Sequence, residues 1–211
     1  MTPGAMVRRL RSRLAGRSFD VVTIGYPGLV RRGKILREPY HLANGWVAFD
    51  FRKALGHPVR IMNDAAMQAL GSYEGGRMLF LGLGTGLGSA MIVDGRLLPM
   101  ELAHLPYKKG GTYEEFVGEA ALRRMGKKKW RKEVAKVVEQ LSEALQPEYV
   151  VIGGGNLRKL DRLPASARPG DNDNAYLGGV RAWDGDPLHA GPTPSLGRAV
   201  AHGRSGRAGR A

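Results

Sequence analysis

The chain contains no cysteine, and this absence excludes disulfide frameworks and thiolate metal centres. No apolar run approaches the roughly 20 residues that a membrane-spanning helix needs. The N-terminal segment MTPGAMVRRLRSRLAG also lacks the apolar stretch of a secretory signal. We therefore expect a soluble, cytoplasmic protein without a membrane partner.

Acidic residues are scarce beside basic ones, with 19 Asp and Glu against 33 Lys and Arg and a formal net charge of +14. Such an excess is typical of proteins that bind nucleic acid or another polyanion. Much of it is local, because residues 123–136 hold eight Lys and Arg against one Glu, and residues 1–20 hold five Arg against one Asp. The pattern favours a solvated helical face and a basic terminus, with a polyanion groove as the alternative.

Hydrophobic patterning predicts a chain in which hairpins are mixed with strand–helix alternation. The predicted helices lie near residues 6–14, 65–73, 130–145 and 157–163. The predicted strands lie near residues 19–25, 58–62, 77–84, 89–98 and 148–153. This order indicates an α/β or α+β fold. From residue 184 onward the chain is rich in Gly, Pro, Ser, Ala and Arg, which predicts a disordered tail.

The segment FLGLGTGLGSAMIVDG, residues 80–95, places four glycines at alternate positions. It has no lysine, so it is not a Walker loop, and the following segment is a strand, so it is not a dinucleotide fingerprint. The remaining interpretation is a hairpin whose backbone N–H groups, with the Thr85 hydroxyl, bind phosphate. An ordinary glycine-rich hairpin is the alternative.

Three further segments carry polar or glycine residues where elements are predicted to end. Asp64 follows a predicted strand and begins a helix, where it is either a helix cap or a group that takes a proton from a hydroxyl. Glu101 and His104 are three residues apart and could face one small polar ligand; the absence of further ligands argues against a metal site. A second glycine turn, residues 153–155, allows a nucleotide to approach the backbone closely.

The order of these motifs resembles the ROK family of sugar kinases (repressor, open reading frame, kinase). The matching segments are TIGYPG, IMNDAA, LGLGTGLGSAMIVDG, ELAH in place of the family's ExGH, and VVIGGGN. The resemblance covers about residues 1–183 and is strongest to the small bacterial glucokinase and polyphosphate glucokinase members. It implies the α/β fold of the actin-like ATPases (ribonuclease H-like), with two subdomains around a cleft.

The resemblance also implies a role for each matching residue. Asp64 matches the catalytic base, which deprotonates the 6-hydroxyl of the sugar. The expected sugar ligands are Asn63, Asp64, Glu101, His104 and Glu114. The expected donor-phosphate ligands are Gly84, Thr85, Gly86 and Gly88, and the expected adenosine motif is Gly153, Gly154 and Gly155. His41 and Asn44 are weaker sugar-ligand candidates, because the family's Asn before Gly-Trp is displaced here.

Two departures from the family pattern limit what the resemblance implies. The zinc cysteines of many members are missing, so we expect no zinc. The chain also has no D-x-G-G-T, the family's first phosphate motif, and its first residues resemble the helix that follows that motif. We therefore expect an incomplete N-terminal subdomain at residues 1–62, a C-terminal subdomain at 63–183 and a tail at 184–211.

The resulting prediction is a kinase that transfers a phosphoryl group from ATP or polyphosphate, with Mg²⁺, to glucose or a similar hexose. The missing motif would impair it, and the alternative is an inactive sugar-binding remnant. A ROK repressor is disfavoured, because only about 20 residues precede the first predicted strand, too few for a helix-turn-helix. Specific nucleic-acid binding is not expected, and a homodimer is compatible with the pattern.

Overall fold

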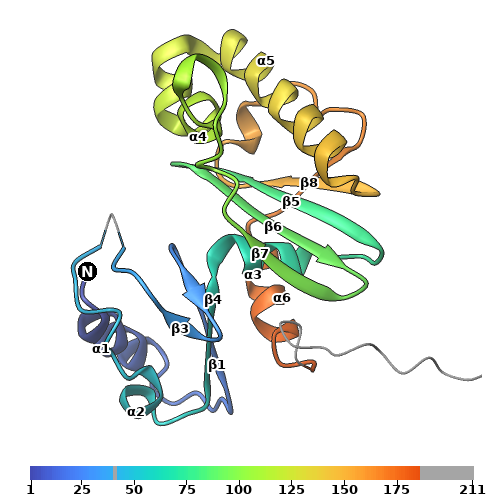
Figure 1. Cartoon of the computed structure of the whole chain (residues 1–211). Helices are drawn as coiled ribbons and strands as arrows, with labels where there is room; N and C mark the ends of the chain where they lie inside the picture. The colour runs from blue at the N-terminus through green and yellow to red at the C-terminus, as the bar shows by residue number, and fades with distance from the viewer. Residues whose placement is uncertain (40–41, 186–211) are drawn as a thin grey trace, which may run out of the picture.

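The structure, a computed structural model, describes residues 1–39 and 42–185. It contains two α/β units, each with its own sheet and hydrophobic core, and the strand–helix junction at residues 59–72 connects them (Figure 1). No helix in the described part of the chain is long and apolar enough to cross a membrane.

The N-terminal unit is built on two parallel strands. Its elements are α1 (Pro3–Arg13), β1 (Val22–Tyr26), β2 (Val30–Arg31), β3 (Lys34–Ile35), α2 (Phe51–Leu55) and β4 (Val59–Asn63). β1 and β4 pair in parallel, from Val22 opposite Val59 to Tyr26 opposite Asn63. The small core between this sheet and its helices includes Ile24, Tyr26 and Phe51.

The C-terminal unit is a five-stranded mixed sheet in the order β7-β6-β5-β8-β9. Its strands are β5 (Arg77–Leu83), β6 (Leu87–Val93), β7 (Arg96–Met100), β8 (Tyr149–Gly153) and β9 (Ala167–Pro169). Its α-helices are α3 (Asp64–Ser72), α4 (Tyr113–Val117), α5 (Glu119–Leu145) and α6 (Asn174–Arg181), and two short 3-10 turns are η1 (Lys108–Gly110) and η2 (Leu157–Lys159). Figure 1 shows α4 and α5 on one face of the sheet, with α3 and α6 on the other.

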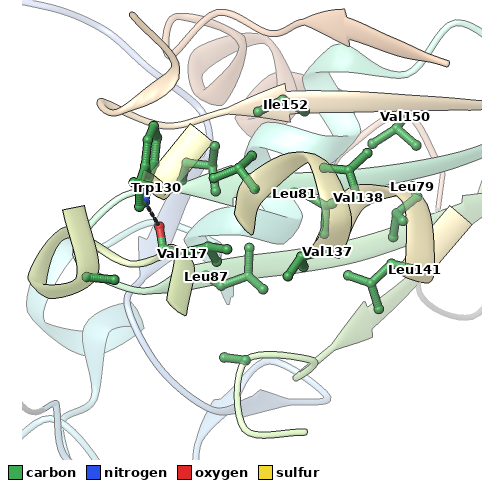
Figure 2. Packing of buried hydrophobic residues seen from close by; sticks show 14 residues of the cluster. Leu79, Leu81, Leu87, Val117, Trp130, Val137, Val138, Leu141, Val150 and Ile152 are labelled. Carbon is green, nitrogen blue, oxygen red and sulfur yellow. Dashed lines mark hydrogen bonds between the residues drawn. The ribbon is translucent and has the colours of Figure 1, made fainter. Parts of the chain in front are cut away.

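Strict alternation along the central strand creates one core on each face of the sheet. Leu79 and Leu81 of β5 point toward α5, whereas Met78 and Phe80 point toward α3, because successive side chains of a strand face opposite sides. The core under α5 is made by the apolar stripe of that helix, which includes Trp130 and Val134 (Figure 2). The rigid sheet therefore has α3 on one face and α4 and α5 on the other.

Most of the predicted elements are confirmed, and the differences have local causes. The helix predicted from residue 130 extends back to residue 127, and beyond the non-helical Gly126 the chain is again helical to Glu119. The helix predicted at 157–163 is wrong: only the η2 turn forms, and Leu160 is already extended at φ −82° and ψ 134°. Pro164 disfavours a helical Leu163, so the chain leaves the helix early. The predicted tail lies outside the described residues from 186 onward.

Candidate active site

The strand–helix junction at residues 63–64 places a carboxylate at the start of α3. Asn63 ends β4 and caps the helix, because its Oδ1 accepts a hydrogen bond from the Ala66 N–H at 3.1 Å. The next residue, Asp64, accepts a hydrogen bond from the Ala65 N–H at 2.8 Å through its own Oδ1. No other side chain in the described part of the chain donates to this carboxylate or forms an ion pair with it. Asp64 is therefore an uncompensated carboxylate.

The environment of Asp64 makes it a stronger base than an ordinary aspartate. Burial raises the pKa of its carboxyl above 3.8, and hydrogen bonds from the backbone N–H groups of Ala65 and Asp64 itself offset this only in part. A carboxylate with a raised pKa, free of cationic partners, is suited to accept a proton from a hydroxyl group.

The glycine hairpin between β5 and β6 presents two free backbone donors at its tip. The Gly84 N–H donates to the Gly86 carbonyl at 3.1 Å, which closes the turn. The N–H groups of Thr85 and Gly86 donate to no acceptor among the described residues, and Thr85 is exposed. Adjacent unpaired N–H groups at an exposed turn can bind an anion, so the hairpin can hold a phosphate.

Two of the hairpin glycines are required by close packing against neighbouring residues and not by an unusual backbone conformation. None of the four glycines of the hairpin has a left-handed φ. At Gly88 an added Cβ would lie 2.7 Å from the Cβ of Ala65, and at Gly86 it would overlap the carboxylate of Glu114. The hairpin therefore lies directly against the residue that follows Asp64 and against a second carboxylate.

The acidic residues Glu101 and Glu114 lie on the same side of the hairpin as Asp64. Glu114 Oε2 is 3.4 Å from the Leu87 nitrogen, which donates to it. Partial desolvation by neighbouring protein atoms raises the pKa of Glu101, His104 lowers it, and the negative charges of Glu114 and Asp64 raise it further. Glu101 Oε1 is 4.0 Å from His104 Nε2, and both side chains are largely exposed, at 62% and 67%. The structure thus brings together three carboxylates and one imidazole from three separate segments: the start of α3, residues 101–104 and α4.

The second glycine turn is attached to the first by backbone and side-chain contacts. The Asn156 N–H donates to the Leu83 carbonyl, and the Asn156 amide Nδ2 donates to the Gly84 carbonyl, both at 3.0 Å. Gly154 has φ +84°, and an added Cβ there would overlap the backbone of Leu83. The two turns, far apart in sequence, therefore form one continuous glycine-lined edge.

Asn156 is a residue of the site that the sequence did not single out. It follows the glycine turn directly, and an Asn at that place is a signal of side-chain bonding to nearby backbone. Its partner Gly84 is 72 residues away, so the pattern alone does not reveal the contact. Asn63 Nδ2 donates one of its two N–H groups to the Gly28 carbonyl at 3.2 Å, and the second N–H has no acceptor among the described residues. His41 lies outside the described residues, and Asn44 is exposed.

The described residues contain no group of three or more His, Asp or Glu side chains that could hold a metal ion by itself. Mg²⁺ commonly uses only one or two carboxylates and completes its shell with water and substrate phosphates. Asp64 beside the free N–H groups of the hairpin is compatible with that pattern, because its carboxylate has no cationic partner.

Comparisons with known proteins relate the sequence and fold of this chain to ROK family proteins. The sequence profile of the ROK family matches residues 4–99. The chain is 30% identical to a polyphosphate glucokinase of Mycobacterium tuberculosis, with 79% of this chain and 71% of that protein covered. It is also similar to the crystal structure of the inorganic polyphosphate/ATP-glucomannokinase of Arthrobacter sp. strain KM, with a TM-score of 0.68, 25% identity, and coverage of 84% of this chain and 79% of that one.

A further solved structure agrees in fold. The ROK family glucokinase of Streptomyces griseus, solved in complex with glucose and AMPPNP, has a TM-score of 0.62 and 17% identity, with 87% of this chain and 89% of that one covered. The fold is thus that of the actin-like ATPase class of sugar kinases, as the sequence predicted. Within that class, the chain belongs to the ROK family.

Proposed function

We propose that this chain transfers a phosphoryl group from ATP or polyphosphate to the 6-hydroxyl of glucose or a similar hexose. The observation that carries the proposal is the position of Asp64. Burial raises its pKa, and the contact between Gly88 and Ala65 holds the start of α3 against the anion-binding hairpin. In-line transfer of a phosphoryl group to a hydroxyl requires a base that lies next to the phosphate site.

In the proposed reaction, Asp64 accepts the proton of the sugar hydroxyl as that oxygen attacks the terminal phosphorus. The N–H groups of Thr85 and Gly86 hold donor phosphate oxygens, and the glycine turn at residues 153–155 contacts the adenosine when ATP is the donor. Because phosphoryl transfer depends mainly on positioning and on charge stabilisation, few other groups are needed. A bound Mg²⁺ would neutralise charge on the donor phosphates and take its ligands from phosphate oxygens and water, which leaves Asp64 free to act as the base.

The hexose would lie between Asp64 and the pair Glu101 and His104. Carboxylates accept hydrogen bonds from sugar hydroxyls, and Glu114 and Asn63 lie within the same group of residues. A site that pairs each hydroxyl discriminates strongly against sugars that lack one. Zinc is not part of this proposal.

The test is a coupled assay of glucose phosphorylation with ATP and with polyphosphate as donors. Asp64→Ala should lower kcat by about 10²- to 10⁴-fold, the usual contribution of a general base, while calorimetry shows glucose affinity within a modest factor of the parent. If transfer survives at the parent rate, Asp64 is not the base.

A second candidate function rests on the absence of D-x-G-G-T from the 211 residues. A polypeptide of this sequence would then bind hexose and transfer phosphate slowly, because the first phosphate motif contributes donor contacts. We expect a version extended at its N-terminus with a family D-x-G-G-T hairpin to be much faster. Equal rates would contradict the idea, and glucose binding without turnover in both versions would identify a sugar-binding protein.

A further inference from the structure

The basic segment of residues 123–136 keeps most of its charges unpaired in the folded protein. Arg123 pairs with Glu119 at 2.5 Å and Arg131 pairs with Asp161. The segment's one acid, Glu133, is occupied by Lys108 at 2.6 Å. The remaining lysines have no carboxylate within salt-bridge distance among the described residues: Lys127, Lys128, Lys129, Lys132 and Lys136.

Three of these lysines form a line on one face of α5. The helix kinks at Gly126, whose φ of 76° and ψ of 159° are not helical, and continues from residue 127 to Leu145. Lys128, Lys132 and Lys136 follow at intervals of four residues, which places them on one face over about 12 Å of helix. All three are exposed. We call Lys128, Lys132 and Lys136 the lysine row.

The helix α5, which carries the lysine row, is hydrogen-bonded to the glycine hairpin and to the η2 turn that follows the second glycine turn. At its start, the Glu119 N–H donates to the Gly84 carbonyl at 3.0 Å and to the Thr85 carbonyl at 3.2 Å. Beyond the kink, Arg131 Nε donates to the Lys159 carbonyl at 2.6 Å, three residues after Asn156. Unpaired positive charge therefore begins beyond the kink at Gly126, close to the phosphate-hairpin end of α5, and continues along the outer side of this helix.

The only aromatic residue in the segment is not available to a ligand. Trp130 is fully buried, and its indole N–H donates to the Val117 carbonyl at 2.8 Å (Figure 2). Single-stranded nucleic acid is usually bound by basic residues together with exposed aromatic rings on which the bases stack. A row of lysines without such a ring matches a polyanion that has no bases.

We propose that the lysine row binds the distal phosphates of an inorganic polyphosphate chain whose terminal phosphate lies at the glycine hairpin. The inference rests on the proposed kinase function and deepens it, because it gives the donor a second contact region on this chain. Lys127 and Lys129 flank Lys128 of the row and add to its positive electrostatic potential. A nucleotide, with three phosphates held at the turns, does not use the row.

The experiment compares two triple variants that remove equal charge. Lys128→Gln, Lys132→Gln and Lys136→Gln neutralise the row, whereas Arg8→Gln, Arg9→Gln and Arg13→Gln neutralise exposed positions on α1. Binding of long-chain inorganic polyphosphate, ATP, glucose and single-stranded oligo(dT) is measured by calorimetry at several salt concentrations. Circular dichroism confirms that each variant folds.

We expect the row variant to bind polyphosphate at least about ten-fold more weakly, with a salt slope smaller by about 2 for three lost phosphate contacts. Its affinities for ATP and glucose should be unchanged, and the α1 variant should match the parent throughout. Unchanged polyphosphate affinity in the row variant would overturn the proposal. The proposal would also be overturned if oligo(dT) bound the parent as tightly as polyphosphate does and if the row variant lost affinity for both to the same extent. Failure of the kinase proposal is separate, because it would appear as absent glucose phosphorylation by the parent in the coupled assay.

Discussion

Gly88 and Ala65 are in such close contact that a Cβ added to Gly88 would lie 2.7 Å from the Cβ of Ala65. β6 and the start of α3 therefore meet with no room for another methyl group. This contact fixes the distance between the glycine hairpin and Asp64, although Gly88 and Asp64 are 24 residues apart in the sequence. The position of Asp64 thus depends on a residue that has no side chain.

Gly88→Ala should therefore harm both stability and transfer. Overpacking in a tight interface costs about 1–3 kcal/mol, so we expect a lower midpoint of urea unfolding together with a lower kcat. Gly84→Ala is the matched control for stability, because nothing lies within 4 Å of its added Cβ and its φ is not left-handed. Equal midpoints for the two variants would show that β6 and α3 can separate without loss.

Asp64→Asn should stabilise the folded protein at neutral pH. Burial raises the pKa of Asp64 in the folded state above the ordinary value of 3.8. The native state therefore binds the proton more tightly than the unfolded state, and it loses stability as pH rises from 3.8 through the folded-state pKa. Removing the charge should raise Tm at pH 7, and the gain should vanish below pH 3.8.

The control for this prediction is Asp50→Asn. Asp50 caps α2, since its Oδ1 accepts from the Lys53 N–H at 2.9 Å, and unlike Asp64 it is exposed. Asn and Asp are nearly equivalent as caps, so little change in Tm is expected. A gain of the same size in both variants would show that burial of Asp64 has no energetic cost.

The two buried tryptophans should respond differently to replacement by phenylalanine. Trp130 donates its indole N–H to the Val117 carbonyl at 2.8 Å, whereas the Trp46 indole nitrogen has no hydrogen-bond partner among residues 1–39 and 42–185. Trp130→Phe leaves a buried carbonyl unpaired, which costs about 1–3 kcal/mol beyond the loss of volume. Trp46→Phe loses volume and also removes an unpaired donor. The free energy of unfolding from denaturant titration should therefore fall more for Trp130→Phe, and the reverse order would contradict the hydrogen-bond argument.

Local features of the site could be predicted from sequence, and long-range ones could not. Asn63 as a helix cap follows from a strand that ends in Asn-Asp before an apolar helix, and the hairpin of β5 and β6 follows from alternation and an Asp-Gly turn. The hydrogen bond between Asn156 and Gly84 joins two residues that no sequence periodicity relates. The spacing of Leu157, Leu160 and Leu163 suggested a helix, although these residues pack on the core from an irregular loop. The roles of the site residues stay predictions until variants are measured.

Replacing Glu114 should separate sugar binding from stability. Its Oε2 accepts from the Leu87 N–H, while the carboxylate of the neighbouring Glu115 accepts from the Thr112 N–H at 2.7 Å and completes a capping box of α4. Glu114→Gln keeps the shape but removes the charge that would accept sugar hydroxyls, so we expect KM for glucose to rise about ten-fold, near 1.4 kcal/mol, the loss of one charged hydrogen bond. Glu115→Gln, which also acts in a capping box, should leave KM unchanged. Steady-state assays measure both, and if KM for the donor rises instead of KM for glucose in Glu114→Gln, the residue acts on the phosphate hairpin and not on the sugar.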